Sequence, residues 1–133
     1  AEVIVVDTNV VAYLYLPGDF TAAAEELLRK HEVWAAPALW RSELRNILAL
    51  YIRKKLLTFD DAYRIQSEAE ALIGDAEYEV DSLDVLRLAA ESGCTAYDCE
   101  FIALSRRLGV PLVTADAKLR KAFPGDTRPF PGA

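Results

Sequence analysis

Apolar residues along the chain occur in short runs that alternate with longer amphipathic stretches. The first run, residues 3–6, consists of β-branched residues and predicts a strand that is buried on both faces, as in a parallel sheet. Further short runs predict strands at 33–36, 78–80 and 111–114, and 128–130 could add a marginal fifth. The stretches between them predict a short helix closed by Pro17-Gly18 and helices at 21–31, 38–56, 58–74, 82–93, 96–108 and from 117 onward.

Strands that alternate with helices predict an α/β fold, with a three-layer α/β/α arrangement around a central, mainly parallel sheet of four to five strands. The length of 133 residues predicts a single domain, residues 1–133. We expect its ordered core at about 3–123 and a fraying tail at about 124–133, where Pro and Gly cluster. No apolar run is long enough for a membrane span, and the first residues do not read as a leader peptide.

The cysteines and the histidine offer little chemistry. Cys94 and Cys99 show no metal-binding spacing and are expected to be buried, small hydrophobic residues of a reducing cytoplasm. His31, the only histidine, lies near a predicted helix end, where a cation suits the helix dipole. A metal site built on His or Cys, or a reaction that uses a histidine base, is therefore disfavoured.

Two acids directly follow predicted strands. Asp7 comes after the first strand and Asp116 after the strand at 111–114, each just before a predicted helix. Either residue could simply cap its helix, which is a common use of aspartate. In a parallel sheet, however, ligands bind outside the carboxyl ends of the strands, so both positions are also candidates for a site.

Two further acids lie on predicted helices, on the side that faces the core. Glu43 falls within the apolar arc of the helix at 38–56, where a carboxylate is costly unless it is paired or bound to a metal. Asp98 lies among apolar residues near the start of the helix at 96–108, where an N-cap role would explain part of its placement. Its neighbour Glu100 points elsewhere, and we exclude it from the candidate site.

Four carboxylates at one sheet edge would repel one another and raise each other's pKa values unless a cation lay between them. Ligation by oxygen alone favours Mg²⁺ or Mn²⁺ over Zn²⁺. Such an ion polarises phosphoryl oxygens and activates water, so hydrolysis of a phosphodiester is the leading reaction class. Thr8, Asn9 and Thr114 are polar neighbours that could orient the water, the phosphate or a carboxylate.

The net charge of −6 argues at first against a nucleic-acid partner, because such domains are usually basic. The four candidate acids account for four of these charges, and the basic residues are grouped. Each group could be an ordinary solvated face or a contact to an RNA backbone. The groups are Arg41 with Arg45, 53–55, Arg106-Arg107 and Lys118 with Arg120-Lys121.

The chain resembles the PIN-domain nucleases in four segments, which run in family order from residue 3 to about 122. The resemblance implies a three-layer α/β/α fold and Mg²⁺- or Mn²⁺-dependent cleavage of RNA. It also implies that the four acids are the catalytic and metal-binding residues, accompanied by Asn9 and Thr114, and none of the acids is substituted. The segments are Val6-Asp7-Thr8-Asn9, residues 37–43 ending in Glu43, Tyr97-Asp98 with 101–104, and residues 112–116 ending in Asp116.

Within that family, a chain with little beyond the core fold looks most like the toxin of a VapBC-type toxin–antitoxin pair. The resemblance therefore implies a cytoplasmic endoribonuclease that forms a homodimer and is inhibited by a small antitoxin protein covering the acidic site. A stand-alone PIN nuclease in RNA processing would carry the same residues, so both roles stay open.

Other classes fit less well. A receiver domain needs an adjacent acid pair after its first strand, whereas Asp7 is followed by Thr8, and Lys118 only loosely supplies the required lysine. A phosphatase of the haloacid dehalogenase type needs a second aspartate where Asn9 stands. A nucleotide-binding module would carry a Gly-rich phosphate loop, which the sequence lacks. A binding module without catalytic activity is the remaining alternative.

Overall fold

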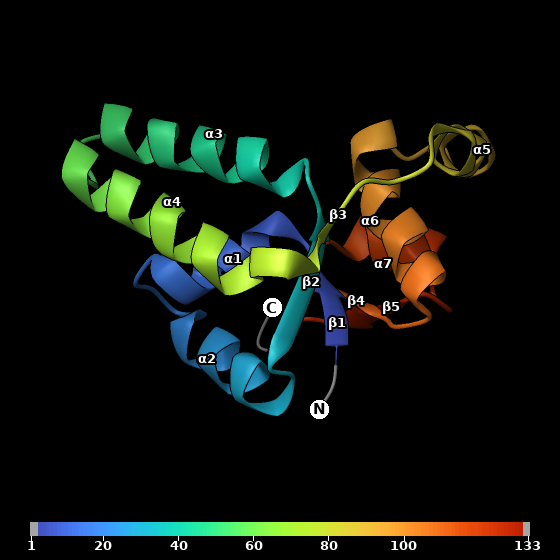
Figure 1. Ribbon diagram of the computed structural model, residues 1–133, viewed down its shortest axis with the longest axis horizontal. Helices are drawn as coiled ribbons and strands as arrows, with labels where there is room; N and C mark the ends of the chain where they lie inside the picture. The colour runs from blue at the N-terminus through green and yellow to red at the C-terminus, as the bar shows by residue number, and fades with distance from the viewer. Residues whose placement is uncertain (1–2, 132–133) are drawn as a thin grey trace.

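The computed structural model describes residues 3–131, and within them five strands alternate with seven α-helices (Figure 1). The strands are β1 Val3–Val6, β2 Val33–Pro37, β3 Glu77–Tyr78, β4 Leu112–Thr114 and β5 Thr127–Pro129. The helices are α1 Thr8–Tyr15, α2 Thr21–Lys30, α3 Trp40–Arg53, α4 Phe59–Ile73, α5 Ser82–Ser92, α6 Ala96–Leu108 and α7 Ala117–Ala122, with a 3₁₀ turn, η1, at Gly74–Ala76.

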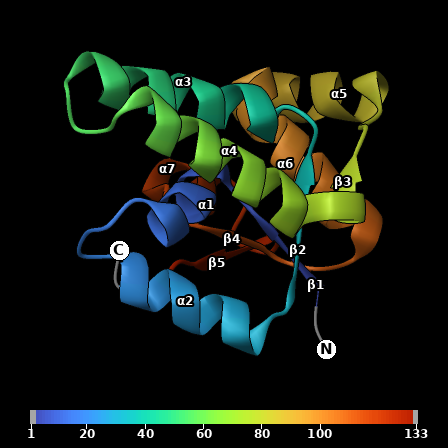
Figure 2. The same cartoon turned by 60° about the vertical axis from the view of Figure 1, so that its left-hand side comes forward.

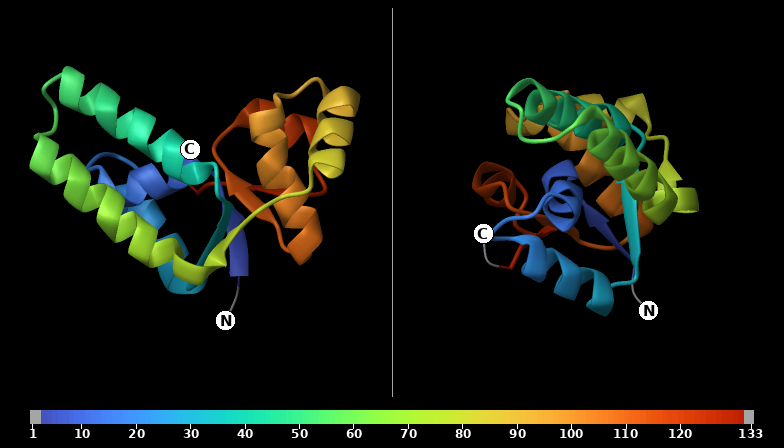
Figure 3. Two further views of the ribbon diagram at one scale, coloured as in Figure 1. Left: turned by 45° about the horizontal axis from the view of Figure 1, so that its top comes forward. Right: turned by 90° about the vertical axis from the view of Figure 1, so that its left-hand side faces the viewer.

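The strands form one parallel sheet in the order β3-β2-β1-β4-β5. From β1 the chain runs toward one edge of the sheet, through α1 and α2 to β2 and through α3 and α4 to β3. It then crosses back through α5 and α6 to β4 and continues through α7 to β5 at the other edge. Because such crossovers are right-handed, α1 to α4 cover one face and α5 to α7 the other (Figures 1 and 3). The predicted three-layer α/β/α fold with a parallel sheet is confirmed.

The core lies between the sheet and its helices. Val5 and Val6 of β1 are fully buried, as expected for a central strand that is covered on both faces. Trp34 of β2 and Trp40 of α3 add the largest buried side chains. The α3–α4 pair packs as a long antiparallel hairpin that extends beyond the sheet (Figures 1 and 2). Within residues 3–131 no helix has the length and apolar character that crossing a membrane would require.

Element boundaries differ most from the sequence-based expectation at two places, and the other boundaries shift by two residues at most. The helix expected at 38–56 ends at Arg53, because the chain turns at Lys55, whose φ of 62° lies in the left-handed region. At the C-terminal end, β5 pairs in parallel with β4, and Phe130 beyond it is only 1% exposed. The packed core therefore extends past residue 123, the limit expected from the Pro and Gly content.

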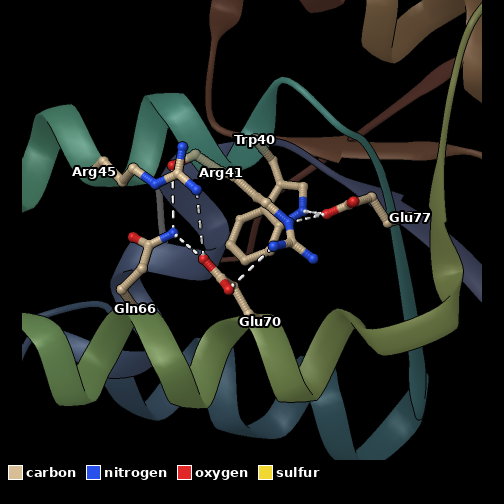
Figure 4. Close-up of polar contacts among 6 residues, drawn as sticks. All are labelled: Trp40, Arg41, Arg45, Gln66, Glu70 and Glu77. Carbon is tan, nitrogen blue, oxygen red and sulfur yellow. Dashed lines mark hydrogen bonds and ion pairs between the residues drawn. The ribbon is translucent and has the colours of Figure 1, made fainter.

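A polar cluster joins the start of α3 to α4 and β3 (Figure 4). Glu77 Oε1 accepts hydrogen bonds from the Trp40 indole N–H at 2.8 Å and from Arg41 Nε at 2.6 Å. Arg41 also pairs with Glu70 on α4 at 3.1 Å, and Gln66 donates to the other oxygen of Glu70 at 2.9 Å. The cluster fixes the first turn of α3 against its neighbours.

This anchoring matters because α3 begins without a side-chain cap. Its N-cap residue, Leu39, makes no capping hydrogen bond, so the free N–H groups of the first turn have no local side-chain acceptor. Glu77 instead holds the side chains of that turn from the neighbouring strand. Glu43 also lies near the start of α3, so the contacts of Glu77 with Trp40 and Arg41 fix its position relative to β3.

Candidate active site

The four acids expected to form a site line one hollow of about 150 Å³. The hollow lies at the carboxyl ends of β1 and β4, where the chain leaves the sheet toward opposite faces. Such a topological switch point is where open α/β sheets bind ligands. The lining residues are Asp7, Thr8, Asn9, Glu43, Ile47, Asp98, Phe101, Asp116 and Leu119.

Asp7 combines the two roles that the sequence left open. Its Oδ1 accepts the backbone N–H of Val10 at 3.1 Å and so caps α1. Its Oδ2 accepts a hydrogen bond from the Thr114 hydroxyl, which the pairing of Val6 with Val113 brings alongside. The pKa of Asp7 is raised from 3.8 to about 6, mainly because the carboxyl is buried. Its hydrogen bonds with Thr114 and Val10 lower the pKa, and the charges of Asp116 and Glu43 make smaller raising contributions.

Glu43 reaches the hollow from α3. Its Oε1 accepts a hydrogen bond from the Thr8 hydroxyl at 2.6 Å. Burial raises the pKa of Glu43, with smaller contributions from the charges of Asp98 and Glu100. Glu100, which the sequence placed away from the site, is thus close enough to act on Glu43 although it does not line the hollow.

Asp98 and Asp116 are positioned by their helices in different ways. Thr95 caps α6 by accepting the Asp98 backbone N–H at 3.0 Å, so the N-cap role considered for the Asp98 carboxylate is wrong. Asp116 does cap α7, because its Oδ1 accepts the N–H groups of Lys118 at 2.9 Å and Leu119 at 3.2 Å. Asp98 therefore faces the hollow without a capping duty, whereas Asp116 also holds its own helix.

The three polar neighbours of the acids, Thr8, Asn9 and Thr114, make different contacts. Thr8 and Thr114 each donate to a carboxylate, and Thr114 also accepts the Asp116 backbone N–H at 3.0 Å. Both threonines are buried and orient the acids. The pairing of β1 with β4 could have suggested the contact between Asp7 and Thr114, because each residue directly follows one of the paired residues Val6 and Val113. Asn9 is exposed and lines the hollow. Contact of these three residues with water or substrate stays a prediction.

The donor set suits Mg²⁺ or Mn²⁺, since only carboxylate, hydroxyl and amide oxygens face the hollow. Across residues 3–131, no three His, Cys, Asp or Glu side chains are gathered closely enough to hold an ion as they stand. Asp7 and Asp116 spend oxygens on hydrogen bonds to protein groups. Coordination of an ion would use the lone pairs that these hydrogen bonds leave and would draw the carboxylates closer together than they are here.

The sequence indicated the acids of the hollow but not the apolar residues that line it beside them. Ile47, Phe101 and Leu119 separate the carboxylates and line the hollow with apolar surface. They are ordinary members of apolar helix faces, so only the packing of α3, α6 and α7 gives them this place. Of the basic groups, Arg41 and Arg106 are held in ion pairs with acids outside the site.

The hydrogen bond from Thr8 to Glu43 predicts an effect on metal affinity. Thr8→Val keeps the shape of the buried side chain but leaves Glu43 without its donor, and we expect about 10- to 100-fold weaker Mn²⁺ binding. Calorimetric titration with Mn²⁺ measures this. Thr8→Ser, which keeps the hydroxyl, serves as the control, and equal affinity in all three proteins would contradict the role.

The raised pKa of Asp7 predicts how the stability of the metal-free protein depends on pH. As the pH rises from about 4 to about 6, the unfolded chain loses this proton before the folded chain does. The contribution of Asp7 to the free energy of unfolding should therefore fall over this window by up to about 3 kcal/mol and level off above it. Urea unfolding with a chelator present measures the difference between the native protein and Asp7→Asn, and a pH-independent difference would contradict the prediction.

Known proteins with similar sequences and structures point to one family. The family model described as PIN domain matches residues 4–123. Ribonuclease VapC3 of Pyrobaculum aerophilum is 31% identical over 130 residues, which cover 95% of this chain and 98% of the relative. Three solved structures share the fold. A protein of Pyrobaculum aerophilum has a TM-score of 0.76 at 24% identity and 98% and 91% coverage of the two chains.

A toxin–antitoxin complex from Klebsiella pneumoniae has a TM-score of 0.69 at 14% identity, with 94% of this chain and 95% of that chain covered. FitAcB from Neisseria gonorrhoeae has the same TM-score at 20% identity, with 96% of both chains covered. At these identities the structural matches establish the fold, and the family rests on the domain model and the sequence relative.

Proposed function

The chain belongs to the PIN-domain family, and on this basis we propose that it is a metal-dependent endoribonuclease that hydrolyses RNA phosphodiester bonds. The observation that carries the proposal is the convergence of Asp7, Glu43, Asp98 and Asp116 on one hollow. These acids come from four separate parts of the chain, and the raised pKa values of Asp7 and Glu43 reflect burial that an ordinary surface acid would not experience.

The four acids would hold one or two divalent ions, Mg²⁺ or Mn²⁺. A bound ion would supply Lewis-acid activation of the phosphate and a water of lowered pKa. The chain's own residues do the positioning: Thr8 orients Glu43 and Thr114 orients Asp7. Asn9, exposed at the edge of the hollow, is placed to meet the RNA or its attacking water.

The most direct test is cleavage of single-stranded RNA with Mg²⁺ or Mn²⁺ by the native protein, by Asp98→Asn and by a control variant outside the site, Asp75→Asn. We expect the native and Asp75→Asn proteins to cleave equally, Asp98→Asn to be inactive, and a chelator to stop cleavage. Metal-independent cleavage, or full activity in Asp98→Asn, would overturn the proposal.

We further propose that the protein is the toxin of a toxin–antitoxin pair and acts in the cytoplasm. The relative named Ribonuclease VapC3, which matches almost from end to end, supports this role. A stand-alone nuclease in RNA processing is the alternative. A small open reading frame next to this gene, whose product co-purifies with the chain and blocks both cleavage and growth arrest, distinguishes the two.

A homodimer is proposed on the same basis. Exposed apolar side chains on α5, Leu83 at 59% and Leu86 at 64%, and Tyr97 of α6 at 63% give apolar surface that a second copy could cover. Analytical ultracentrifugation of the native protein and of a Leu83→Glu, Leu86→Glu variant tests this. A monomeric native protein, or a dimer unaffected by the two charges, would contradict it.

A further inference from the structure

A second hollow of about 290 Å³ adjoins the acidic one. The two share Asn9 and Ile47 in their linings, so they are neighbours, and the second hollow extends toward the α1–α2 loop. The volume lies close to the lower end of the range for small-ligand sites, about 300–1,000 Å³. The remaining lining residues are Ala12, Tyr13, Leu16, Pro17, Gly18, Asp19, Phe20 and Tyr51.

Three aromatic rings line this second hollow, and two of them, Tyr13 and Phe20, are held in place by neighbouring rings. The ring of Tyr13 packs against Phe20 at a centroid distance of 4.9 Å and against Phe130 at 5.1 Å. Phe20 and Phe130 meet edge to face at 6.1 Å, and Phe130 is buried. Tyr13 is therefore a fixed ring, and Tyr51 of α3 supplies a second ring to the same lining.

The loop that forms the outer wall is also fixed. The Thr21 hydroxyl accepts the Gly18 backbone N–H at 3.0 Å and donates to the Leu16 carbonyl at 3.1 Å. The Thr21 backbone N–H in turn donates to the Gly18 carbonyl at 3.3 Å. A ligand that enters the hollow thus meets a preformed wall and has little loop ordering to pay for.

Polar groups lie between these rings. Among residues 3–131, neither the Tyr13 nor the Tyr51 hydroxyl has a protein hydrogen-bond partner, and the Asn9 side chain has none either. Burial raises the pKa of the Tyr13 hydroxyl, and the charge of Asp7 and the phenol of Tyr51 make smaller raising contributions. These groups could donate to and accept from the edge of a planar heterocycle.

The charges around the hollow select against an anion. Its lining contains Asp19 and, among the described residues, no Lys or Arg. A phosphate would be repelled here, whereas an uncharged aromatic ring would find two tyrosine rings and free hydrogen-bonding groups. In the neighbouring acidic hollow, by contrast, the proposed divalent ions would offset the carboxylates and attract the phosphate.

We propose that the Tyr13–Tyr51 hollow binds the base of a nucleotide next to the scissile phosphate of a single-stranded RNA. The proposal rests on the endoribonuclease function argued above and adds a site that selects among RNA substrates. The lining shared with the acidic hollow favours RNA over a polypeptide, since the base and the phosphate of one nucleotide would then occupy neighbouring hollows. A single strand is required because bases that are stacked in a helix cannot turn into a pocket.

An abasic scan tests the proposal. Short single-stranded oligoribonucleotides that span a mapped cut carry one abasic nucleotide at successive positions, and their binding is measured by fluorescence anisotropy in an Asp98→Asn background. At one position next to the cut, loss of the base should weaken binding about five- to 150-fold, the range for stacking of a base on an aromatic residue. Elsewhere the effect should be small.

Variants of Tyr51 tie the effect to the hollow. Tyr51→Leu should weaken binding of the unmodified oligonucleotide to a similar extent and abolish the sensitivity at that one position, whereas Tyr51→Phe, which keeps the ring, should retain most of both. Tyr63→Leu is the matched control, because Tyr63 is 68% exposed on α4 and lies outside the hollow. Thermal unfolding of each variant checks that it is folded.

The outcomes separate this proposal from the proposed function. If the native protein cleaves the oligonucleotide but the abasic scan is flat, the base site is wrong and the nuclease stands. If Tyr51→Leu binds RNA as Tyr63→Leu does, the hollow serves another occupant, such as a polypeptide segment, and the base site is again wrong. If the native protein neither binds nor cleaves RNA, both proposals fall.

Discussion

Asp7→Asn is expected to reduce RNA cleavage by about 10²- to 10⁴-fold, the range for removing one preorganised electrostatic group from an active site. Asp7 lies at the centre of the candidate site, bonded to Thr114 and close to the charges of Asp116 and Glu43. An amide keeps the size of the side chain but removes the charge that would attract a cation. The loss should appear in the cleavage rate and in Mn²⁺ affinity measured by titration.

The same substitution should not weaken the metal-free fold. Burial already disfavours the charged form of Asp7, so a neutral amide relieves repulsion within the acidic hollow. We expect the free energy of unfolding near neutral pH to be equal to or higher than that of the native protein. Asp75→Asn, on an exposed 3₁₀ turn, is the matched control. An Asp7→Asn protein that is destabilised, or one that cleaves RNA normally, would contradict the assignment.

The second large effect concerns Glu77, which lies far from the acids but holds the start of α3. Glu77→Ala removes the shared acceptor of the Trp40 indole and the Arg41 guanidinium, and Trp40 is fully buried (Figure 4). An unpaired buried donor and the loss of a charged hydrogen bond together should lower the free energy of unfolding by about 2–4 kcal/mol. Urea unfolding of the metal-free protein measures this loss.

Glu79→Ala is the control for Glu77→Ala, because Glu79 is exposed. Among residues 3–131 its side chain has no hydrogen-bond partner, and its backbone carbonyl accepts a hydrogen bond from Arg107. Its stability should stay within about 0.5 kcal/mol of the native value. The free energy of unfolding of Glu77→Gln should lie between those of Glu77→Ala and Glu79→Ala, since an amide oxygen can still accept a hydrogen bond from the Trp40 indole. Equal stability of the Glu77 and Glu79 variants would show that the cluster does not hold α3.

The sequence was informative where a local pattern has a single physical meaning. Four β-branched residues before Asp7 specify a buried parallel strand, and alternation with helices specifies the layers. Glu43 was recognisable because a carboxylate in an apolar helical arc needs a reason to be there. The four acids do line one hollow, and their roles in metal binding and catalysis remain proposals for the experiments above.

Other features depend on contacts between distant segments, so their local signal is weak. The sequence placed β3 at 78–80 and β5 at 128–130, each one residue later than its observed start. With two and three residues neither strand shows a clear alternation, and their bounds are set by pairing with β2 and β4. Phe130 follows a Pro-containing stretch that suggests a loose end, yet it packs on Tyr13. Thr95 rather than Asp98 caps α6, which only the geometry of the helix start could decide.

The pairing of β1 with β4 has a consequence for the synthesis of the chain. Thr114 and Asp7 are 107 residues apart in the sequence, so loop closure over most of the chain must precede their contact and folding is expected to be slow. A nascent chain whose residues beyond 110 are still within the ribosome has Asp7, Glu43 and Asp98 but neither Thr114 nor Asp116. The acidic hollow is therefore completed only once Thr114 and Asp116 have left the ribosome, and synthesis interrupted before that point would release fragments that lack part of it.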